Sequence, residues 1–130
     1  LCSNVPSQQI IQTALGGYQS VDALLKPGGR IYEQRECVYN ALSSIDGVSV
    51  VKPKAAFYIF PKFDMDKFHI NDDEQFVLDF LKKKKILLVQ GTAFNYPTPD
   101  HARIVYLPTV KELTHATDEL ADFLKNYSQY

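Results

Sequence analysis

The sequence predicts an α+β fold, an α/β sandwich in which a small mixed sheet is covered by helices. Apolar residues recur with helical spacing in four segments, and short runs of β-branched and aromatic residues stand between them. The predicted order is helix, helix, strand, strand, helix, strand, strand, helix, which is typical of a small sheet packed against helices. A chain of 130 residues, 45% of them hydrophobic, can bury one core of this kind.

The first third of the chain is predicted to form two helices. The first opens near Pro6, which is favoured in a first helical turn, and ends at the glycine pair 16–17. The second runs from about residue 30 to residue 45, where the apolar positions form one stripe. Between them, the Pro-Gly-Gly stretch at 27–29 is the best candidate for a domain boundary.

Two short strands are predicted next, at residues 48–51 and 55–60. Both runs are rich in β-branched and aromatic residues, which favour strands. Pro61 ends the second strand, and residues 62–71 are expected to form a loop.

The second half of the chain is predicted to place two strands between two helices. Acidic residues at 72–74 open the first helix and lysines at 82–85 close it, so each charge set complements its end of the helix dipole. Strands follow at 86–89 and 102–107. A capping box at Thr109 begins the last helix.

Composition argues against several classes of function. The net charge of −1 and the isoelectric point near 6.3 provide no general attraction to nucleic acid or to anionic membranes. No apolar stretch approaches the roughly 18 residues of a membrane helix. Neither Cys2 nor Cys37 has metal-ligand spacing, and the histidines are scattered, so no metal site is predicted. A reducing cytoplasm is the expected location.

One arginine stands among apolar residues in the predicted strand at 102–107. Because side chains alternate along a strand, Arg103 shares a face with Val105 and Leu107. A guanidinium stays charged in a protein and needs an anion, and its planar fork fits a carboxylate. Two sources of that anion remain open: a structural ion pair, with Asp100 or another acid, or a bound ligand.

The loop that precedes this strand is a candidate wall for a small pocket. Residues 90–100 include Phe94 and Asn95, and binding residues are frequent on such loops. Among the histidines, His101 is retained as a candidate because it lies beside the loop and Arg103.

At this point the sequence resembles a known family. Residues 52–61 resemble the proline–x–(glycine or alanine)–alanine–phenylalanine–tyrosine–x–phenylalanine–proline segment in the C-terminal small domain of class I (fold type I) aminotransferases, which use pyridoxal phosphate. Residues 88–94, Leu-Val-Gln-Gly-Thr-Ala-Phe, are similar to the strand and loop of that family in which leucine–valine is followed by glycine–x–x–phenylalanine, and a strand with a central arginine follows in both. Residues 3–17 look like the helix after the cofactor lysine in the bacterial alanine (glutamate–pyruvate) aminotransferases.

The resemblance implies a division of the chain and a role for one residue. Residues 1–27 would be the helical tail of the large cofactor-binding domain, and residues 28–130 the small domain. Arg103 would pair bidentately with the α-carboxylate of the amino-acid or 2-oxo-acid substrate, with Phe94 and Asn95 in the loop beside it. The Schiff-base lysine and the other cofactor-binding positions would lie upstream, so no catalytic, cofactor-binding or metal residue is assigned in this chain.

We therefore expect the C-terminal portion of a pyridoxal-phosphate aminotransferase that acts on alanine or glutamate and their 2-oxo acids. The resemblance implies a cytoplasmic homodimer at full length, with no nucleic-acid or membrane partner, and an inactive fragment when the chain is alone. Two alternatives stay open: a related fold type I lyase or decarboxylase, and a non-catalytic carboxylate-binding module.

Overall fold

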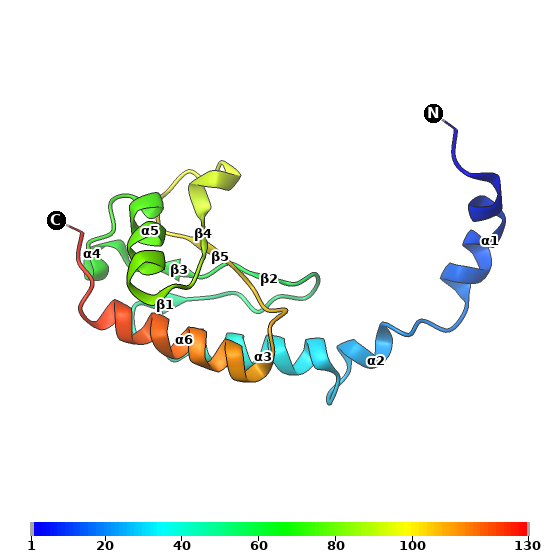
Figure 1. Ribbon diagram of the computed structural model, residues 1–130, viewed down its shortest axis with the longest axis horizontal. Coiled ribbons are helices and arrows are strands. Elements are labelled where there is room, and N and C mark those ends of the chain that lie inside the picture. Colours follow the sequence, from blue (N-terminus) through cyan, green and yellow to red (C-terminus); the bar gives the residue numbers. More distant parts are fainter. Residues whose placement is uncertain (1, 130) are drawn as a thin grey trace.

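The computed structural model describes residues 2–129 and confirms the α+β class (Figure 1). Helices surround short strands, and the predicted order of the long elements is present. The elements in chain order are α1 (Val5–Gly16), α2 (Asp22–Leu25), α3 (Arg30–Ser43), β1 (Val48–Ser49), β2 (Tyr58–Ile59), β3 (Lys62–Phe63), α4 (Met65–Phe68), α5 (Asp73–Lys84), β4 (Val89–Gln90), the 3₁₀ helix η1 (Gly91–Phe94), β5 (Ala102–Val105) and α6 (Val110–Lys125).

The long helices begin at side chains that satisfy their free backbone N–H groups. The Asn4 side chain accepts a hydrogen bond from the Ser7 N–H at the start of α1, and Asp72 caps α5 in the same way. In α6 the predicted capping box is confirmed: Thr109 accepts from the Glu112 N–H, and the Glu112 carboxylate accepts from the Thr109 N–H. Within residues 2–129, no helix combines the length and apolar character needed to cross a bilayer.

The strands form two small antiparallel sheets, which corrects the expectation of one mixed sheet. β1 pairs with β3, and β5 lies between β2 and β4. All pairings between strands in the described range are antiparallel. An antiparallel bridge between Lys62 and His101 links the two sheets.

Residues 62–71 are not the plain loop expected from the sequence. Pro61 separates β2 from β3 because proline has no N–H to donate to a ladder, yet its carbonyl still accepts from the Ala102 N–H at 3.3 Å. The chain then pairs again as β3 and turns into α4. Proline therefore interrupts the pairing without ending it.

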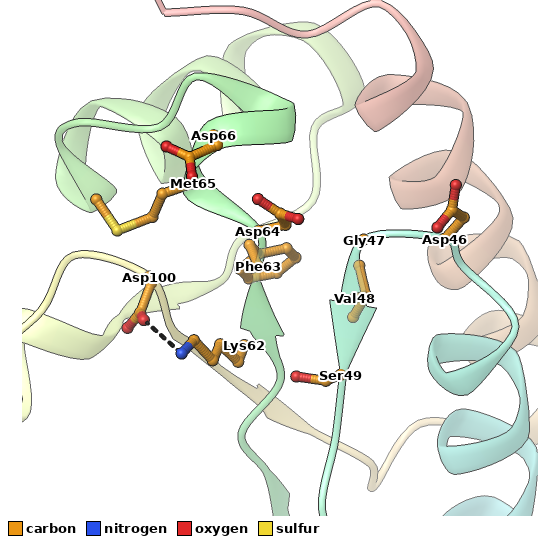
Figure 2. A pocket seen from close by; sticks show the side chains of 10 residues that line it. All are labelled: Asp46, Gly47, Val48, Ser49, Lys62, Phe63, Asp64, Met65, Asp66 and Asp100. Carbon is orange, nitrogen blue, oxygen red and sulfur yellow. Dashed lines mark ion pairs between the residues drawn. The ribbon is translucent and has the colours of Figure 1, made fainter.

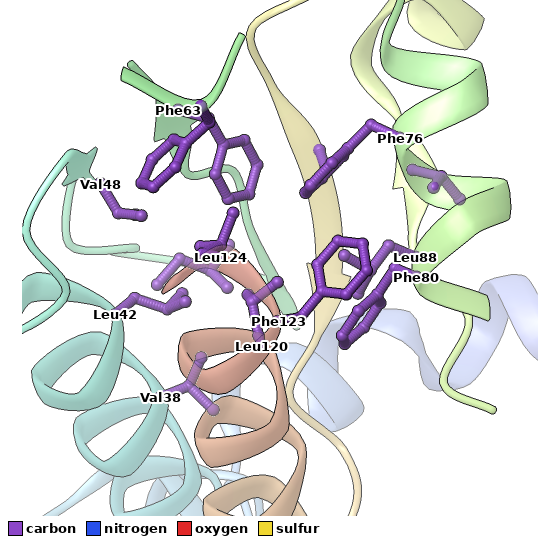
Figure 3. Close-up of a cluster of buried hydrophobic side chains, with 14 of the residues drawn as sticks. Val38, Leu42, Val48, Phe63, Phe76, Phe80, Leu88, Leu120, Phe123 and Leu124 are labelled. Atoms are coloured by element: carbon purple, nitrogen blue, oxygen red, sulfur yellow. The ribbon is translucent and has the colours of Figure 1, made fainter. Parts of the chain in front are cut away.

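The core lies where α3, α5 and α6 meet the strands (Figure 3). Phe123 of α6 lies with its ring centroid 6.0 Å from that of Phe76 and 5.2 Å from that of Phe80, both on α5. The same core buries Ala102 and Tyr106, so one face of β5 is held against it. This leaves the alternate residues of β5 on the other face.

The N-terminal helix is not part of this core. Among its residues none is buried, and Figure 1 shows α1 projecting away from the rest of the molecule, with α2 between them. Ile10 and Leu15 are 62% and 75% exposed.

Candidate carboxylate-binding site

Arg103 lies in β5, the middle strand of the three-stranded sheet, where it is opposite Val89 of β4. Its side chain is partly buried and leaves the face opposite to Ala102, as the predicted alternation requires. The Arg103 Nε atom is buried and has no hydrogen-bond partner within residues 2–129. A buried donor without an acceptor is costly, which makes this atom unusual.

Two aromatic rings lie against the Arg103 guanidinium. Its central carbon is 4.7 Å from the centroid of the Tyr58 ring and 4.5 Å from that of the Phe94 ring. These distances are those of cation–π contacts, which attract a cation without neutralising its charge. Tyr58 comes from β2 and Phe94 from η1, so two separate segments orient the guanidinium.

A structural ion pair between Arg103 and Asp100 is contradicted. Among the described residues, no carboxylate oxygen lies within 4.0 Å of the Arg103 nitrogens, and the guanidinium donates no hydrogen bond. Asp100 instead faces Lys62 Nζ at 3.4 Å, and it accepts a hydrogen bond from Thr98 Oγ1 at 2.6 Å. His101 Nδ1 lies 2.5 Å from the same carboxylate. The charge on Arg103 is thus free to meet an anion from outside the described chain.

The environment of Asp100 keeps it ionised and committed to these partners. Although burial opposes ionisation, hydrogen bonds from Thr98, His101 and Lys62 hold the pKa of Asp100 below its ordinary value. The His101 ring also stacks on Phe60, with 4.8 Å between centroids. His101, a candidate from the sequence, therefore braces the loop and is not brought to Arg103.

The loop before β5 is held close to the strand at its first residue. The Gly91 N–H donates to the His101 carbonyl at 2.9 Å, and a Cβ on Gly91 would lie 2.9 Å from that same oxygen. Only glycine fits there without displacing backbone. The structure brings Phe94 to Arg103, whereas the side chain of Asn95, which has φ 57°, makes no hydrogen bond within residues 2–129.

The sequence pattern did not mark Tyr58, Asp73 or Thr92 as residues of this site. Tyr58 was visible only as part of a strand, although its place opposite Val105 puts it on the Arg103 face. Asp73 belongs to the acidic start of a helix in the sequence, but in the structure it also accepts two hydrogen bonds from Thr92 in η1. Such contacts join segments 19 residues apart, and no local pattern signals them.

Two hollows lie near these elements, and they differ in character. Figure 2 shows the first, of about 630 Å³, beside β1 and β3; four aspartates line it, and Lys62 pairs with one of them, Asp100. Arg103 does not line it. The second, of about 530 Å³, has mostly apolar walls from β4, β5 and α6 and includes Arg103. No group of three or more metal-ligating side chains gathers in the range 2–129.

The comparisons with known proteins agree with this geometry. The family model for class I and II aminotransferases matches residues 1–120. The chain is 55% identical over 129 residues to the glutamate-pyruvate aminotransferase AlaA of Escherichia coli, covering 99% of this chain and 32% of that protein. An alanine aminotransferase of Mycobacterium tuberculosis is 52% identical, with 99% and 30% covered.

Solved structures give the same result. An aminotransferase from Escherichia coli superposes with a TM-score of 0.89 at 54% identity, covering 99% of this chain and 32% of that one. Alanine aminotransferase from Pyrococcus furiosus gives a TM-score of 0.77 at 36% identity, with 96% and 31% covered. The chain thus spans about a third of the length of these relatives and matches their C-terminal part. It belongs to the class I and II aminotransferases.

Proposed function

We propose that this chain is the substrate-binding C-terminal part of an aminotransferase that moves an amino group between alanine or glutamate and a 2-oxo acid. The observation that carries the proposal is the Arg103 guanidinium, which two aromatic rings orient and no acid in residues 2–129 neutralises. The names of the relatives, glutamate-pyruvate and alanine aminotransferases, support the choice of substrates.

In this proposal Arg103 binds the α-carboxylate that amino acids and 2-oxo acids share. Its fork presents two parallel N–H groups, which suit a carboxylate bidentately, and charge-assisted bonds of this kind are the strong ones. Because both substrates carry the same group, one arginine serves both halves of the exchange. Tyr58 and Phe94 keep the guanidinium oriented and exclude water from its faces.

The family implies pyridoxal phosphate, which when bound serves as an electron sink at the substrate's α-carbon. We assign no residue of this chain to hold it. The lysine and the phosphate ligands belong, in this proposal, to the part of the relatives' length that the chain does not span. Residues 1–27 would form the end of that large domain, and residues 28–130 the small domain.

We also propose that the full-length protein is a cytoplasmic homodimer and that the chain alone is inactive. Cys2 and Cys37 are both free thiols, which is typical of a reducing compartment. Inactivity follows from the absence of an assigned Schiff-base lysine.

The test replaces Arg103 in the full-length, cofactor-loaded enzyme. Arg103→Ala should lower kcat/KM for alanine and for 2-oxoglutarate by roughly 10²–10⁴-fold, because two charge-assisted hydrogen bonds are lost. The absorbance of the bound cofactor should not change. The kcat/KM of Arg103→Lys should lie between that of the unaltered enzyme and that of Arg103→Ala, since lysine keeps the positive charge but lacks the planar fork of the guanidinium.

Arg35→Ala is the matched control and should leave kcat/KM nearly unchanged. Arg35 also lies over an aromatic ring, Tyr32 at 5.1 Å, but it pairs with Glu36 and does not line the Arg103 hollow. Unchanged kinetics in Arg103→Ala would remove the proposed role. Release of ammonia or carbon dioxide in place of amino transfer to pyruvate would identify a lyase or a decarboxylase.

A further inference from the structure

Asp73 carries a buried carboxylate, and both of its oxygens accept hydrogen bonds from one residue distant in sequence, Thr92. It is 3% exposed, in the first turn of α5. The Thr92 N–H donates to Asp73 Oδ2 at 2.9 Å, and the Thr92 hydroxyl donates to Oδ1 at 2.7 Å. Burial of a charge is costly unless hydrogen bonds compensate it, so these two bonds are what Asp73 requires.

Capping of α5 does not explain this arrangement. Asp72 already caps the helix by accepting from the N–H groups of Glu74 and Gln75. Glu74 lies in the same first turn as Asp73, carries the same charge and is exposed. A carboxylate that served only the helix dipole could stay in solvent, as Glu74 does.

The two ends of the contact differ in how firmly they are held. α5 is anchored in the core through Phe76 and Phe80, which are 1% and 0% exposed. η1 is a single short turn on the surface, where Phe94 is 46% exposed. The bonds from Asp73 therefore fix the loop to a rigid helix.

Thr92 lies two residues before Phe94 in η1, and the Phe94 ring lies 4.5 Å from the Arg103 guanidinium carbon. On its other side the Gly91 N–H bonds to the His101 carbonyl, and the Phe94 ring meets the Phe60 ring edge-on, with 6.5 Å between centroids. The bonds from Thr92 to Asp73 are the hydrogen bonds that tie the turn itself to α5, and they help to set the place of the Phe94 ring.

We propose that Asp73 and Thr92 form a positioning pair, which holds η1 so that Phe94 stays against Arg103 and thereby sets the affinity for the substrate carboxylate. The inference rests on the proposed function of Arg103. Neither residue touches substrate in this proposal; both act through Phe94.

The test compares Asp73→Asn with Glu74→Gln in the full-length, cofactor-loaded enzyme. Each variant removes one negative charge from the first turn of α5, but only Asp73→Asn disturbs Thr92. We expect Asp73→Asn to raise KM for both alanine and pyruvate by roughly twofold to thirtyfold, the range of a lost cation–π contact, with kcat within about twofold. Amide hydrogen exchange in residues 91–95 should become faster. Glu74→Gln should change neither.

A second pair of variants guards against misfolding of Asp73→Asn. Thr92→Val removes the hydroxyl at nearly constant volume and should raise KM for both substrates, whereas Thr92→Ser keeps the hydroxyl and should restore KM to near the original value. Equal effects of Asp73→Asn and Glu74→Gln would overturn the proposal. So would faster exchange in the loop with unchanged KM, or equal KM in Thr92→Val and Thr92→Ser.

The result for Arg103→Ala separates the two proposals. If that variant leaves KM and kcat unchanged, the proposed function is wrong whatever Asp73→Asn does. If Arg103→Ala is impaired and Asp73→Asn is not, only the positioning pair is wrong.

Discussion

At the scale of single residues, Arg103 differs from another arginine that also meets an aromatic ring. Arg35 lies 5.1 Å from the centroid of the Tyr32 ring, and its Nη2 atom lies 3.0 Å from a carboxylate oxygen of Glu36. Arg103 has two rings and no acid within residues 2–129. Aromatic contact orients both arginines, but only Arg35 is neutralised by its own chain.

Asp100 provides a prediction about pH at this scale. Its pKa is lowered in the folded state, so its bonds stabilise the fold above the ordinary carboxyl value of 3.8 and lose their effect as the pH falls through the lower, folded value. Asp100→Asn should therefore reduce the free energy of unfolding of the chain at pH 7 by about 2 kcal/mol. The difference from the unaltered chain should shrink in acid. Urea denaturation at a series of pH values measures both.

Asp118→Asn is the control for that experiment, because Asp118 is exposed on α6. It should leave the unfolding free energy nearly unchanged at every pH. A difference between Asp100→Asn and the unaltered chain that stays constant down to the most acid pH would contradict the prediction.

At the scale of elements, Tyr127 is one of the residues after α6 that contact α5. The Tyr127 hydroxyl donates to Asp79 Oδ2 at 3.2 Å, and its ring centroid lies 4.6 Å from that of Phe123 and 5.3 Å from that of Phe76. This contact joins the two helices where their aromatic residues meet.

Burial, with the nearby Asp79 carboxylate, raises the pKa of Tyr127 to about 12 from an ordinary value of 10.0. The unfolded chain ionises first, so the contribution of Tyr127 to stability is complete below pH 10 and is lost as the pH rises toward 12. Tyr127→Phe should therefore lose less unfolding free energy over that interval than the unaltered chain. Tyr18→Phe removes a hydroxyl from an 87% exposed side chain, so its unfolding free energy should decrease over that interval as much as that of the unaltered chain. Parallel curves for Tyr127→Phe and the unaltered chain would refute this account.

Elements that depend on local signals were predictable from the sequence, and those that depend on distant partners were not. The capping residues Asn4, Asp72 and Thr109 act within four residues of their own position, and helices α1, α5 and α6 begin where they were expected. The two-residue strands have almost no local pattern, because each exists only through its partner. β3 was therefore missed, since it pairs with β1 beyond Pro61.

The candidate site divides in the same way. Arg103 could be identified from the sequence alone, because a charged residue within an apolar run is conspicuous there. The Tyr58 contact and the bonds between Asp73 and Thr92 depend on sheet register and on the packing of α5, which a single sequence does not display.

At the scale of the whole molecule, apolar surface is concentrated in the first 25 residues. Large side chains on α1, α2 and the segment between them are exposed, and the chain spans about a third of its relatives' length. Exposed apolar patches of this kind mark surfaces that contact other protein. The exposed residues are Val5, Ile10, Ile11, Leu15, Tyr18, Val21, Leu24 and Leu25.

We predict that the chain alone associates with itself through this surface. Sedimentation velocity should show an average mass that rises with concentration, and the double variant Ile10→Ser/Leu15→Ser should reduce the rise. Val51→Ser, which changes an apolar residue outside the helices that is even more exposed, at 86%, is the control and should have little effect. A monomer at all concentrations would show that this surface does not drive association.

The register of β5 constrains how this region can change in length among related enzymes. Val89 faces Arg103 across the sheet, and Ala102 leaves the opposite face into the core. One residue inserted between the His101 bridge and Arg103 would turn the guanidinium inward and bring an aliphatic side chain beside Phe94. Residues added between η1 and Asp100 would not change the face on which Arg103 lies, because the bridge at His101 fixes the register of the strand that follows it. Length variation should therefore occur in the loop and not in the strand.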